Sequence, residues 1–268
     1  MLRSSNPILS KKDAFTPAAP QYGQQQFGQS PYGSGYEPAP TQTSGDRMTF
    51  DDVVTKTAVT MGTLILAAAA AWFLIPNSLQ LPAMVLSGLV GFVVVMIVSF
   101  RRAVNPTLVL LYAAIEGVFI GMISKYFEGF YDGIVAQAIL GTFAAAGVTL
   151  AAYKFFNIRV TPKFQKVVVI ATIAFAVAML ANFLLSLVGV NLGLRDGGTG
   201  PVSLLAVGVS LLGAVLAVLN LVLDFDYIEK GVQAGAPAKE SWRGAFGLTV
   251  TMVWLYIEIL RLLSYLRR

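Results

Sequence analysis

The sequence predicts an all-α integral membrane protein in which seven transmembrane helices form a bundle. The chain of 268 residues is 56% hydrophobic and only 12% charged, and its mean hydropathy of +0.70 is far above that of a soluble domain. Seven apolar runs, each about long enough to cross a bilayer, fill the chain from Thr57 to Leu266. Three of these runs carry a carboxylate, at Glu116, Asp224 and Glu258, where lipid disfavours an ionised group.

The first 48 residues are expected to form a disordered cytosolic tail. The stretch from Gln21 to Pro40 consists of Gln, Gly, Pro, Ser and spaced aromatic residues, which cannot bury a core. No apolar run precedes Thr57, so the first helix is expected to direct insertion without a cleavable signal peptide. Thr49 with Asp52 three residues later is typical of a helix N-terminus. The membrane domain is therefore expected over residues 49–268.

The spans are delimited by residues that stop or restart helices. The breaks are Pro76-Asn77, Asn105-Pro106, Thr161-Pro162 and the segment from Gly197 to Pro201. A span needs about 20 apolar residues, each adding about 1.5 Å. We expect spans over residues 57–75, 81–100, 106–124, 134–153, 167–190, 202–230 and 244–265, of which the sixth includes a polar extension.

The distribution of Lys and Arg beside the spans predicts a cytosolic N-terminus. Eleven basic residues lie on that side against four on the other, and the cytosolic side of a membrane protein carries the excess. The larger set is Arg47, Lys56, Arg101, Arg102, Lys154, Arg159, Lys163, Lys166, Lys230, Lys239 and Arg243, and the smaller is Lys125, Arg195, Arg267 and Arg268. Seven crossings place Arg267 and Arg268 outside, whereas a re-entrant seventh helix is the alternative that keeps them inside.

The composition excludes most enzyme classes. The chain has no cysteine and no histidine, which removes disulfides, thiolate nucleophiles, Ser-His hydrolases and His- or Cys-ligated metals. It lacks the Gly-x-Gly-Asp tetrapeptide of intramembrane aspartyl proteases and a lysine in the seventh span that could bind retinal. We therefore expect no enzymatic activity and no resident cofactor. The net charge of +5 reflects basic loops beside the membrane, and no nucleic-acid partner is expected.

The membrane carboxylates are the candidate functional residues. Glu116 lies roughly 15 Å into the third span, near the bilayer midplane, and Glu258 lies roughly 21 Å into the seventh. Asp224 ends the apolar stretch of the sixth span, with Asn220 one turn before it and Asp226 after it. Each carboxylate is expected to face the bundle interior and to be paired, protonated or hydrated. Two carboxylates that share one dry site cannot both ionise easily.

Each carboxylate also has a purely structural alternative. Glu258 has Arg261 three residues ahead on the same helix and could form an intrahelical ion pair. Asp224 could be an interfacial residue at a helix end, since Asp226 and further charged residues follow it. Glu116 has no charged neighbour within a helical turn and could be a neutral acid hydrogen-bonded inside the bundle.

Three motifs resemble a known family of membrane proteins. LDFDYI, from Leu223 to Ile228, and LYIEIL, from Leu255 to Leu260, resemble the paired-acid sixth and seventh helices of the Bax inhibitor-1/YccA family. YAAIEG, from Tyr112 to Gly117, is similar to the third helix of that family. The resemblance covers the chain from Thr49 to the C-terminus, and the Gln/Gly/Tyr-rich tail followed by MTFDDVVTKT resembles the actinobacterial branch.

The resemblance implies six helices around a central seventh and a pH-sensitive calcium leak in the bacterial plasma membrane. It makes Asp224 and Glu258 the gate, the pH sensor and a transient calcium site. It also implies a latch on this pair by an arginine at the end of the second helix, Arg101 or Arg102. Asn220, Asp226 and Arg261 are expected around the pair. The chain departs from the family because its second acid is Glu where calcium-leak relatives carry Asp, and because its loop over residues 231–243 is longer than usual.

A different function follows from the YccA branch of the same family. That branch implies a non-conducting regulator that binds a membrane protease or another membrane-protein assembly. On this hypothesis the carboxylates are fixed hydrogen-bonding groups in the core, and the tail makes the contact. The expected depths also place Glu258 well below Asp224, so the two meet only if the seventh helix begins nearer the cytosol than residue 244.

Overall fold

The computed structural model describes residues 47–101, 103–156, 158–190, 192–195 and 202–268. The tail predicted over residues 1–48 lies outside this part of the chain, apart from Arg47 and Met48. Arg47 forms an isolated antiparallel bridge with Pro237. Met48 is buried and packs in one apolar cluster with Val53 and Ile228. The chain is therefore packed against the helices from these two residues onward.

Seven helices long and apolar enough to cross a membrane make up the described chain, as the sequence predicts. They are α1 (Phe50–Leu74), α2 (Gln80–Phe100), α3 (Pro106–Glu128), α4 (Ile134–Phe155), α5 (Pro162–Leu187), α6 (Leu204–Gln233) and α7 (Glu240–Leu266), and a 3-10 turn, η2 (Asn77–Leu79), precedes α2. Several helices extend one or two turns beyond the predicted spans into polar sequence. Hydropathy marks only the part of a helix that lies in hydrocarbon, whereas capping residues mark where the helix ends.

Side-chain caps start α1, α3 and α5, the last two at predicted breaks. The Thr49 hydroxyl accepts a hydrogen bond of 3.1 Å from the backbone N–H of Asp52, which confirms the predicted start of α1. The Asp52 carboxylate does not complete a capping box, because it pairs with Lys56 at 2.6 Å. Asn105 and Thr161 cap α3 and α5 in the same way, each followed by a proline at the first helical position.

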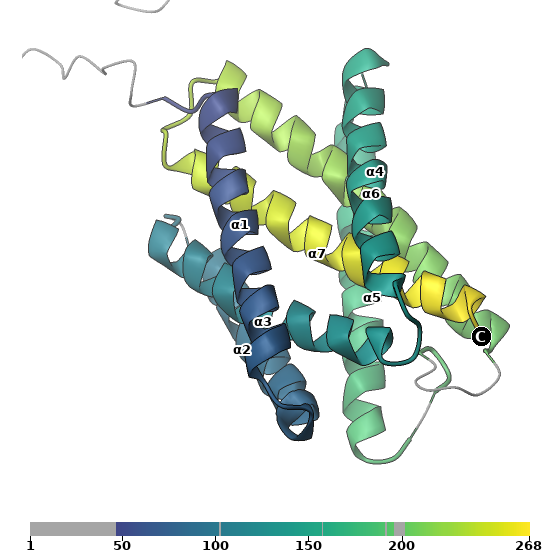
Figure 1. The fold of residues 1–268 in the computed structure, drawn as a ribbon. Helices are drawn as coiled ribbons and strands as arrows, with labels where there is room; N and C mark the ends of the chain where they lie inside the picture. Colours follow the sequence, from purple (N-terminus) through teal and green to yellow (C-terminus); the bar gives the residue numbers. More distant parts are fainter. Residues whose placement is uncertain (1–46, 102, 157, 191, 196–201) are drawn as a thin grey trace, which may run out of the picture. The chain divides into compact units, whose positions relative to one another are not determined.

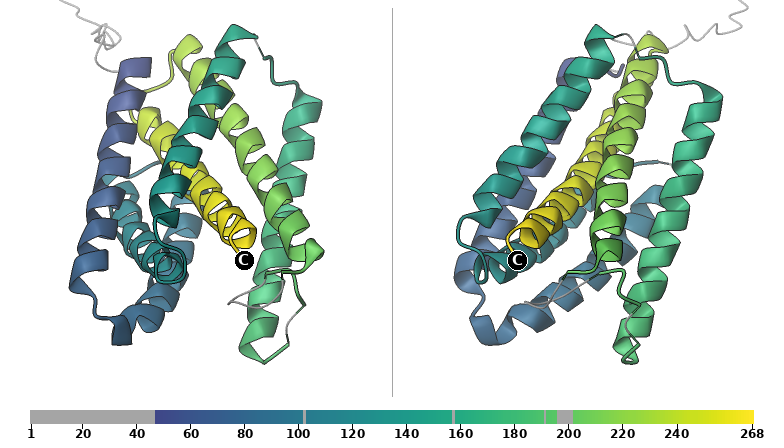
Figure 2. Two further views of the ribbon diagram at one scale, coloured as in Figure 1. Left: turned by 45° about the vertical axis from the view of Figure 1, so that its right-hand side comes forward. Right: turned by 90° about the vertical axis from the view of Figure 1, so that its right-hand side faces the viewer.

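Helix α7 lies at the centre of the bundle, as the family resemblance implies. It packs against α1, α3, α4 and α6, and Figure 1 shows it running diagonally across the bundle, past α1 near its start and past α4 nearer its end. Helix α5 packs on α6 at the edge, where both views of Figure 2 place it. It still reaches the centre through Phe175, whose ring lies 5.6 Å from that of Trp254 on α7. Polar side chains on α7 are therefore the ones that neighbouring helices shield best from lipid.

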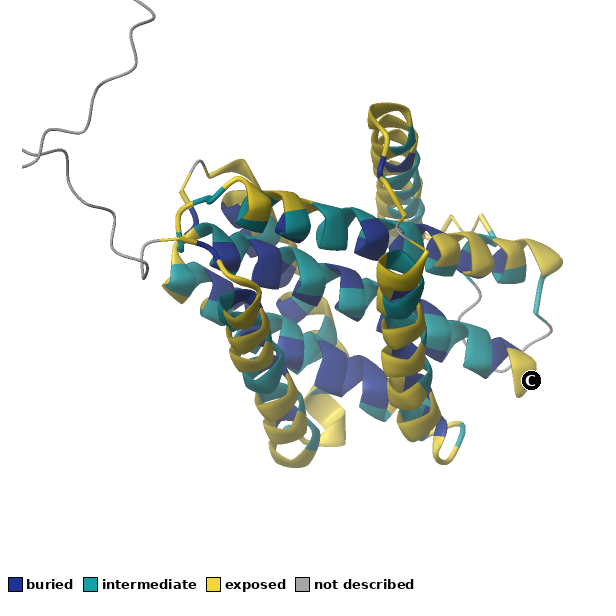
Figure 3. Cartoon of the chain, turned by 90° about the horizontal axis from the view of Figure 1, so that it is seen from above, coloured by how far each residue is buried: buried dark blue, intermediate teal, exposed yellow. Residues whose placement is uncertain are grey.

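The outward faces of the helices are apolar and exposed. Phe73, Phe100 and Leu204 are 82%, 84% and 90% exposed, and many further large apolar side chains share this outer surface. Seen from above in Figure 3, the exposed positions follow the outer sides of the helices and the buried ones face neighbouring helices. Such a surface suits acyl chains and not water. The chain is thus a multi-pass integral membrane protein.

Candidate functional site

Asp224 on α6 and Glu258 on α7 lie at the interface between these two helices, each against a glycine of the opposite helix. A methyl group at Gly213 of α6 would lie 2.8 Å from Cδ and Oε1 of Glu258. A methyl group at Gly247 of α7 would lie 3.1 Å from Oδ1 of Asp224. Any larger residue would collide with a carboxylate, so the glycines create the space in which the two acids are accommodated.

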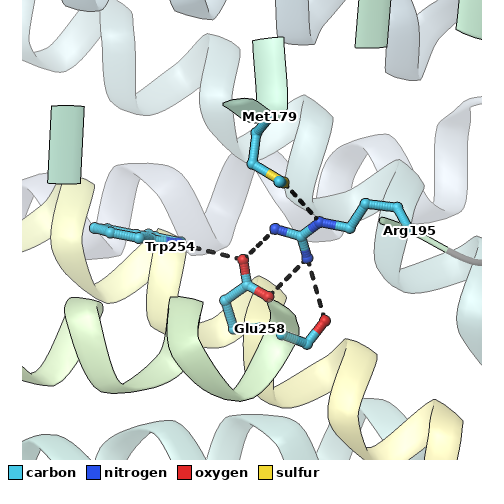
Figure 4. A network of polar contacts seen from close by, with 5 residues as sticks. Met179, Arg195, Trp254 and Glu258 are labelled. Atoms are coloured by element: carbon cyan, nitrogen blue, oxygen red, sulfur yellow. Dashed lines mark hydrogen bonds and ion pairs between the residues drawn. The ribbon is translucent and has the colours of Figure 1, made fainter. Parts of the chain in front are cut away.

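Glu258 is only 1% exposed, and an arginine from the loop between α5 and α6 holds it. Arg195 donates from Nη1 to Oε2 at 2.7 Å and from Nη2 to Oε1 at 2.6 Å (Figure 4). The indole Nε1 of Trp254 donates to Oε1 at 3.3 Å. A bidentate pair of this kind is a strong and directional contact, and the low polarity of the interior strengthens it.

The Arg195 side chain contacts three helices. Its Nε contacts the Met179 sulfur at 3.2 Å, and Nη1 lies 3.4 Å from the Ser210 hydroxyl. Its guanidinium lies 5.7 Å from the centre of the Phe175 ring, a cation–π contact. Helices α5, α6 and α7 therefore all contribute to holding this loop arginine in the bundle.

Asp224 sits in a different environment. Its Oδ2 accepts a hydrogen bond of 2.7 Å from the Thr251 hydroxyl of α7. Among the described residues it has no ion-pair partner. Helix α6 continues nine residues beyond it to Gln233, so Asp224 is not the helix-end residue that the structural alternative supposed.

The structure does not bring Asp224 and Glu258 together. Thr251, which binds Asp224, precedes Glu258 by seven residues on α7, which corresponds to about 10 Å along the helix. The difference in depth expected from the sequence is therefore present, and α7 begins at Glu240 without closing it. Among the described residues, no group of three or more His, Cys, Asp or Glu side chains could hold a metal ion.

Glu116 repeats the glycine arrangement at another interface. It lies on α3, and a methyl group at Gly91 of α2 would lie 2.7 Å from its Oε2. No described residue donates a hydrogen bond to its carboxylate, so the hydrogen-bonded acid considered from the sequence is not formed with this part of the chain. Among the described residues Glu116 forms no ion pair, and it lies on α3 and not on α6 or α7.

The three residues expected around the acid pair make other contacts. Asn220 donates to the Thr172 hydroxyl of α5 at 2.7 Å and not to Asp224. Asp226 pairs with Lys230 at 2.6 Å near the end of α6. Arg261 forms no ion pair with Glu258, because that carboxylate is occupied by the loop arginine; instead it lines a cavity with Arg195.

The predicted latch from the second helix is not formed by Arg101. This residue ends α2 with an exposed side chain and makes no ion pair with either acid. The other candidate, Arg102, lies outside the described residues. Arg195 was not predicted as a site residue, although the sequence held one signal. It is the only Lys or Arg from residue 167 to residue 229, and the predicted topology places it on the outer side of the membrane, toward which Glu258 lies.

Comparison with known proteins identifies the family of this chain. The family described as Bax inhibitor 1 like matches residues 6–268, which is nearly the whole chain. No curated protein matches the sequence. Together with the seven membrane-length helices, this match establishes the family. The chain belongs to the Bax inhibitor 1 like family of integral membrane proteins.

Proposed function

We propose that this protein is a pH-sensitive calcium leak of the bacterial plasma membrane, with its N-terminus in the cytosol, and that the Arg195–Glu258 pair holds it closed. The observation that carries the proposal is the bidentate ion pair on a carboxylate that is 1% exposed on the central helix. A charged pair inside a membrane bundle marks a functional position more often than a stabilising one.

The acids provide two successive oxygen stations for a passing calcium ion. Glu258 lies toward the outer end of α7, and Asp224 with the Thr251 hydroxyl lies about 10 Å nearer the cytosol. Calcium prefers carboxylate, hydroxyl and carbonyl oxygens, and conduction requires several weak sites in place of one tight site. This proposal replaces the single acid pair expected from the sequence with two separate sites.

In the closed state the Arg195 guanidinium occupies the side-chain oxygens of Glu258, which a calcium ion must pass. Its positive charge also repels a divalent cation at a position with low polarity, where Coulomb forces are strong. Only an ionised Glu258 makes the two charge-assisted bonds. Protonation of Glu258 therefore weakens the ion pair, and Arg195 can move away from the carboxyl group. The described groups facing Glu258 are Arg195, Arg261 and the Trp254 indole.

The proposal predicts that calcium flux rises as the pH falls, and that neutralising Glu258 removes most of this dependence. The full-length protein is reconstituted in liposomes in phosphate-free buffer, and flux is measured over a pH series for wild type, Glu258→Gln and Asp224→Asn. Glu258→Gln is expected to leak at neutral pH about as fast as wild type at acidic pH. Asp224→Asn is expected to lower flux at every pH, because it removes a negative charge from the path but leaves the latch.

Asp132→Asn is the matched control, since Asp132 is an exposed carboxylate in the loop before α4. It is expected to behave like wild type. No flux above empty liposomes at any pH, from protein that remains folded, would reject the leak and favour the non-conducting regulator that binds a membrane protease or another membrane protein.

A further inference from the structure

A cavity of about 560 Å³ beside the ion pair is lined by two arginines. Arg195 enters from the loop after α5, and Arg261 enters from α7, one turn beyond Glu258. Asn182 and Ser186 on the last turns of α5 line the opposite wall. Apolar side chains complete the lining, so the cavity combines several hydrogen-bond donors with a hydrophobic surface.

The charges in this cavity do not balance among the described residues. The one described carboxylate that pairs with either arginine is Glu258, and both of its oxygens are bonded to Arg195. Among the described residues, Arg261 makes no ion pair, and its buried Nε has no hydrogen-bond partner. A partly buried cation without a counter-ion is costly, so such a site gains from an external anion.

Further donors are free to bind the same anion. The Asn182 side-chain amide makes no hydrogen bond with the described residues. The Ser186 hydroxyl already donates to the Phe183 carbonyl at 2.6 Å, so its oxygen accepts only from a protonated oxygen of the ligand. Guanidinium groups prefer planar or tetrahedral oxyanions that accept several hydrogen bonds at once.

We propose that this cavity binds a phosphate group through Arg261, Asn182 and the outer edge of Arg195. Arg261 lies five residues before the end of α7, about 7.5 Å along the helix, which is the depth of lipid headgroups. Phosphate at this depth comes either from a phospholipid headgroup or from free phosphate in solution. Phosphate binding at this site does not depend on ion conduction, so it is measured without a flux assay.

Binding of inorganic phosphate to the full-length protein in a neutral detergent tests the site. Phosphate is titrated at constant ionic strength with chloride as the balancing anion, and the apparent Kd is read from the rise in thermal stability. Arg261→Gln is expected to weaken binding by about tenfold or more, since it removes a charge-assisted contact. Arg267→Gln, an exposed arginine that donates to the Asp132 carbonyl, is the matched control and should bind like wild type.

Asn182→Asp provides a second variant that leaves both arginines in place. It adds a negative charge to the cavity wall and should abolish phosphate binding by repulsion, even if Arg261→Gln does not fold. Competition by phosphatidylglycerol in mixed micelles, but not by diacylglycerol, would assign the site to a lipid headgroup. Phosphate binding without such competition would assign it to the free anion. No saturable binding, or equal affinity in Arg261→Gln, Asn182→Asp and Arg267→Gln, overturns the proposal.

Discussion

Glycine residues determine where the acids of this protein can lie. Gly213 leaves room for Glu258, and Gly247 leaves room for Asp224. A methyl group at these two positions would lie 2.8 Å and 3.1 Å from the respective carboxylates, which is shorter than an ordinary contact. Each acid therefore depends on the absence of one methyl group on the facing helix.

The substitution Gly213→Ala is expected to displace Glu258 and weaken its pair with Arg195. The added methyl group would also lie 2.8 Å from Cζ of Phe175, so the neighbours on both sides must move. Overpacking of this kind costs about 1–3 kcal/mol. We expect higher calcium flux at neutral pH and a lower midpoint of thermal unfolding.

Gly208→Ala on the same helix serves as the control for this change. A methyl group at Gly208 would meet no atom within 4 Å. This variant should keep the flux of wild type and be equally or slightly more stable, because alanine favours a helix over glycine. Equal flux in Gly213→Ala and Gly208→Ala would show that the position of Glu258 does not control the leak.

The sequence indicated Asp224 and Glu258 as candidate residues but not the arginine that pairs with Glu258. Asp224 and Glu258 were identifiable because an ionisable residue in an apolar run is rare and costly. Arg195 lies 63 positions from Glu258 in a loop, and no periodicity connects a loop residue to a helix face. The contact arises only when α5, α6 and α7 pack together, so it could not be derived from spacing.

At the scale of helices, glycines of α3 allow its backbone to lie directly against the backbone of α1. A methyl group at Gly117 would lie 2.4 Å from the Leu64 carbonyl oxygen, and one at Gly121 would lie 2.4 Å from that of Ala68. Small residues four apart allow two helices to approach in this way within a membrane. The spans of both helices were predicted from hydropathy, but this contact between them was not.

Gly121→Ala is expected to separate α1 from α3 and to destabilise the bundle by about 1–3 kcal/mol. The methyl group meets backbone atoms of Ala68, which cannot rotate away as a side chain can. Thermal unfolding in detergent measures the effect. Gly147→Ala on α4, where a methyl group meets nothing within 4 Å, is the control. A midpoint for Gly121→Ala equal to that of Gly147→Ala would contradict this packing.

For the molecule as a whole, the central position of α7 links its fold to its proposed function. The helix contacts α1, α3, α4 and α6, carries Glu258 and presents Gly247 and Thr251 to Asp224. Hydropathy predicted the number and the approximate limits of the helices because crossing hydrocarbon demands a fixed apolar length. Their assembly depends on side-chain packing at interfaces that are as apolar as lipid, which hydropathy does not resolve.

A double-mutant cycle on Arg195 and Glu258 tests the latch most directly. Calcium flux at neutral pH is compared in liposomes for wild type, Arg195→Gln, Glu258→Gln and the double variant. If the two residues act as one latch, each single variant and the double variant leak at the same raised rate, about tenfold or more above wild type, because one interaction is lost in all three. Additive effects, or single variants that leak no faster than wild type, would contradict the proposal that this pair closes the path.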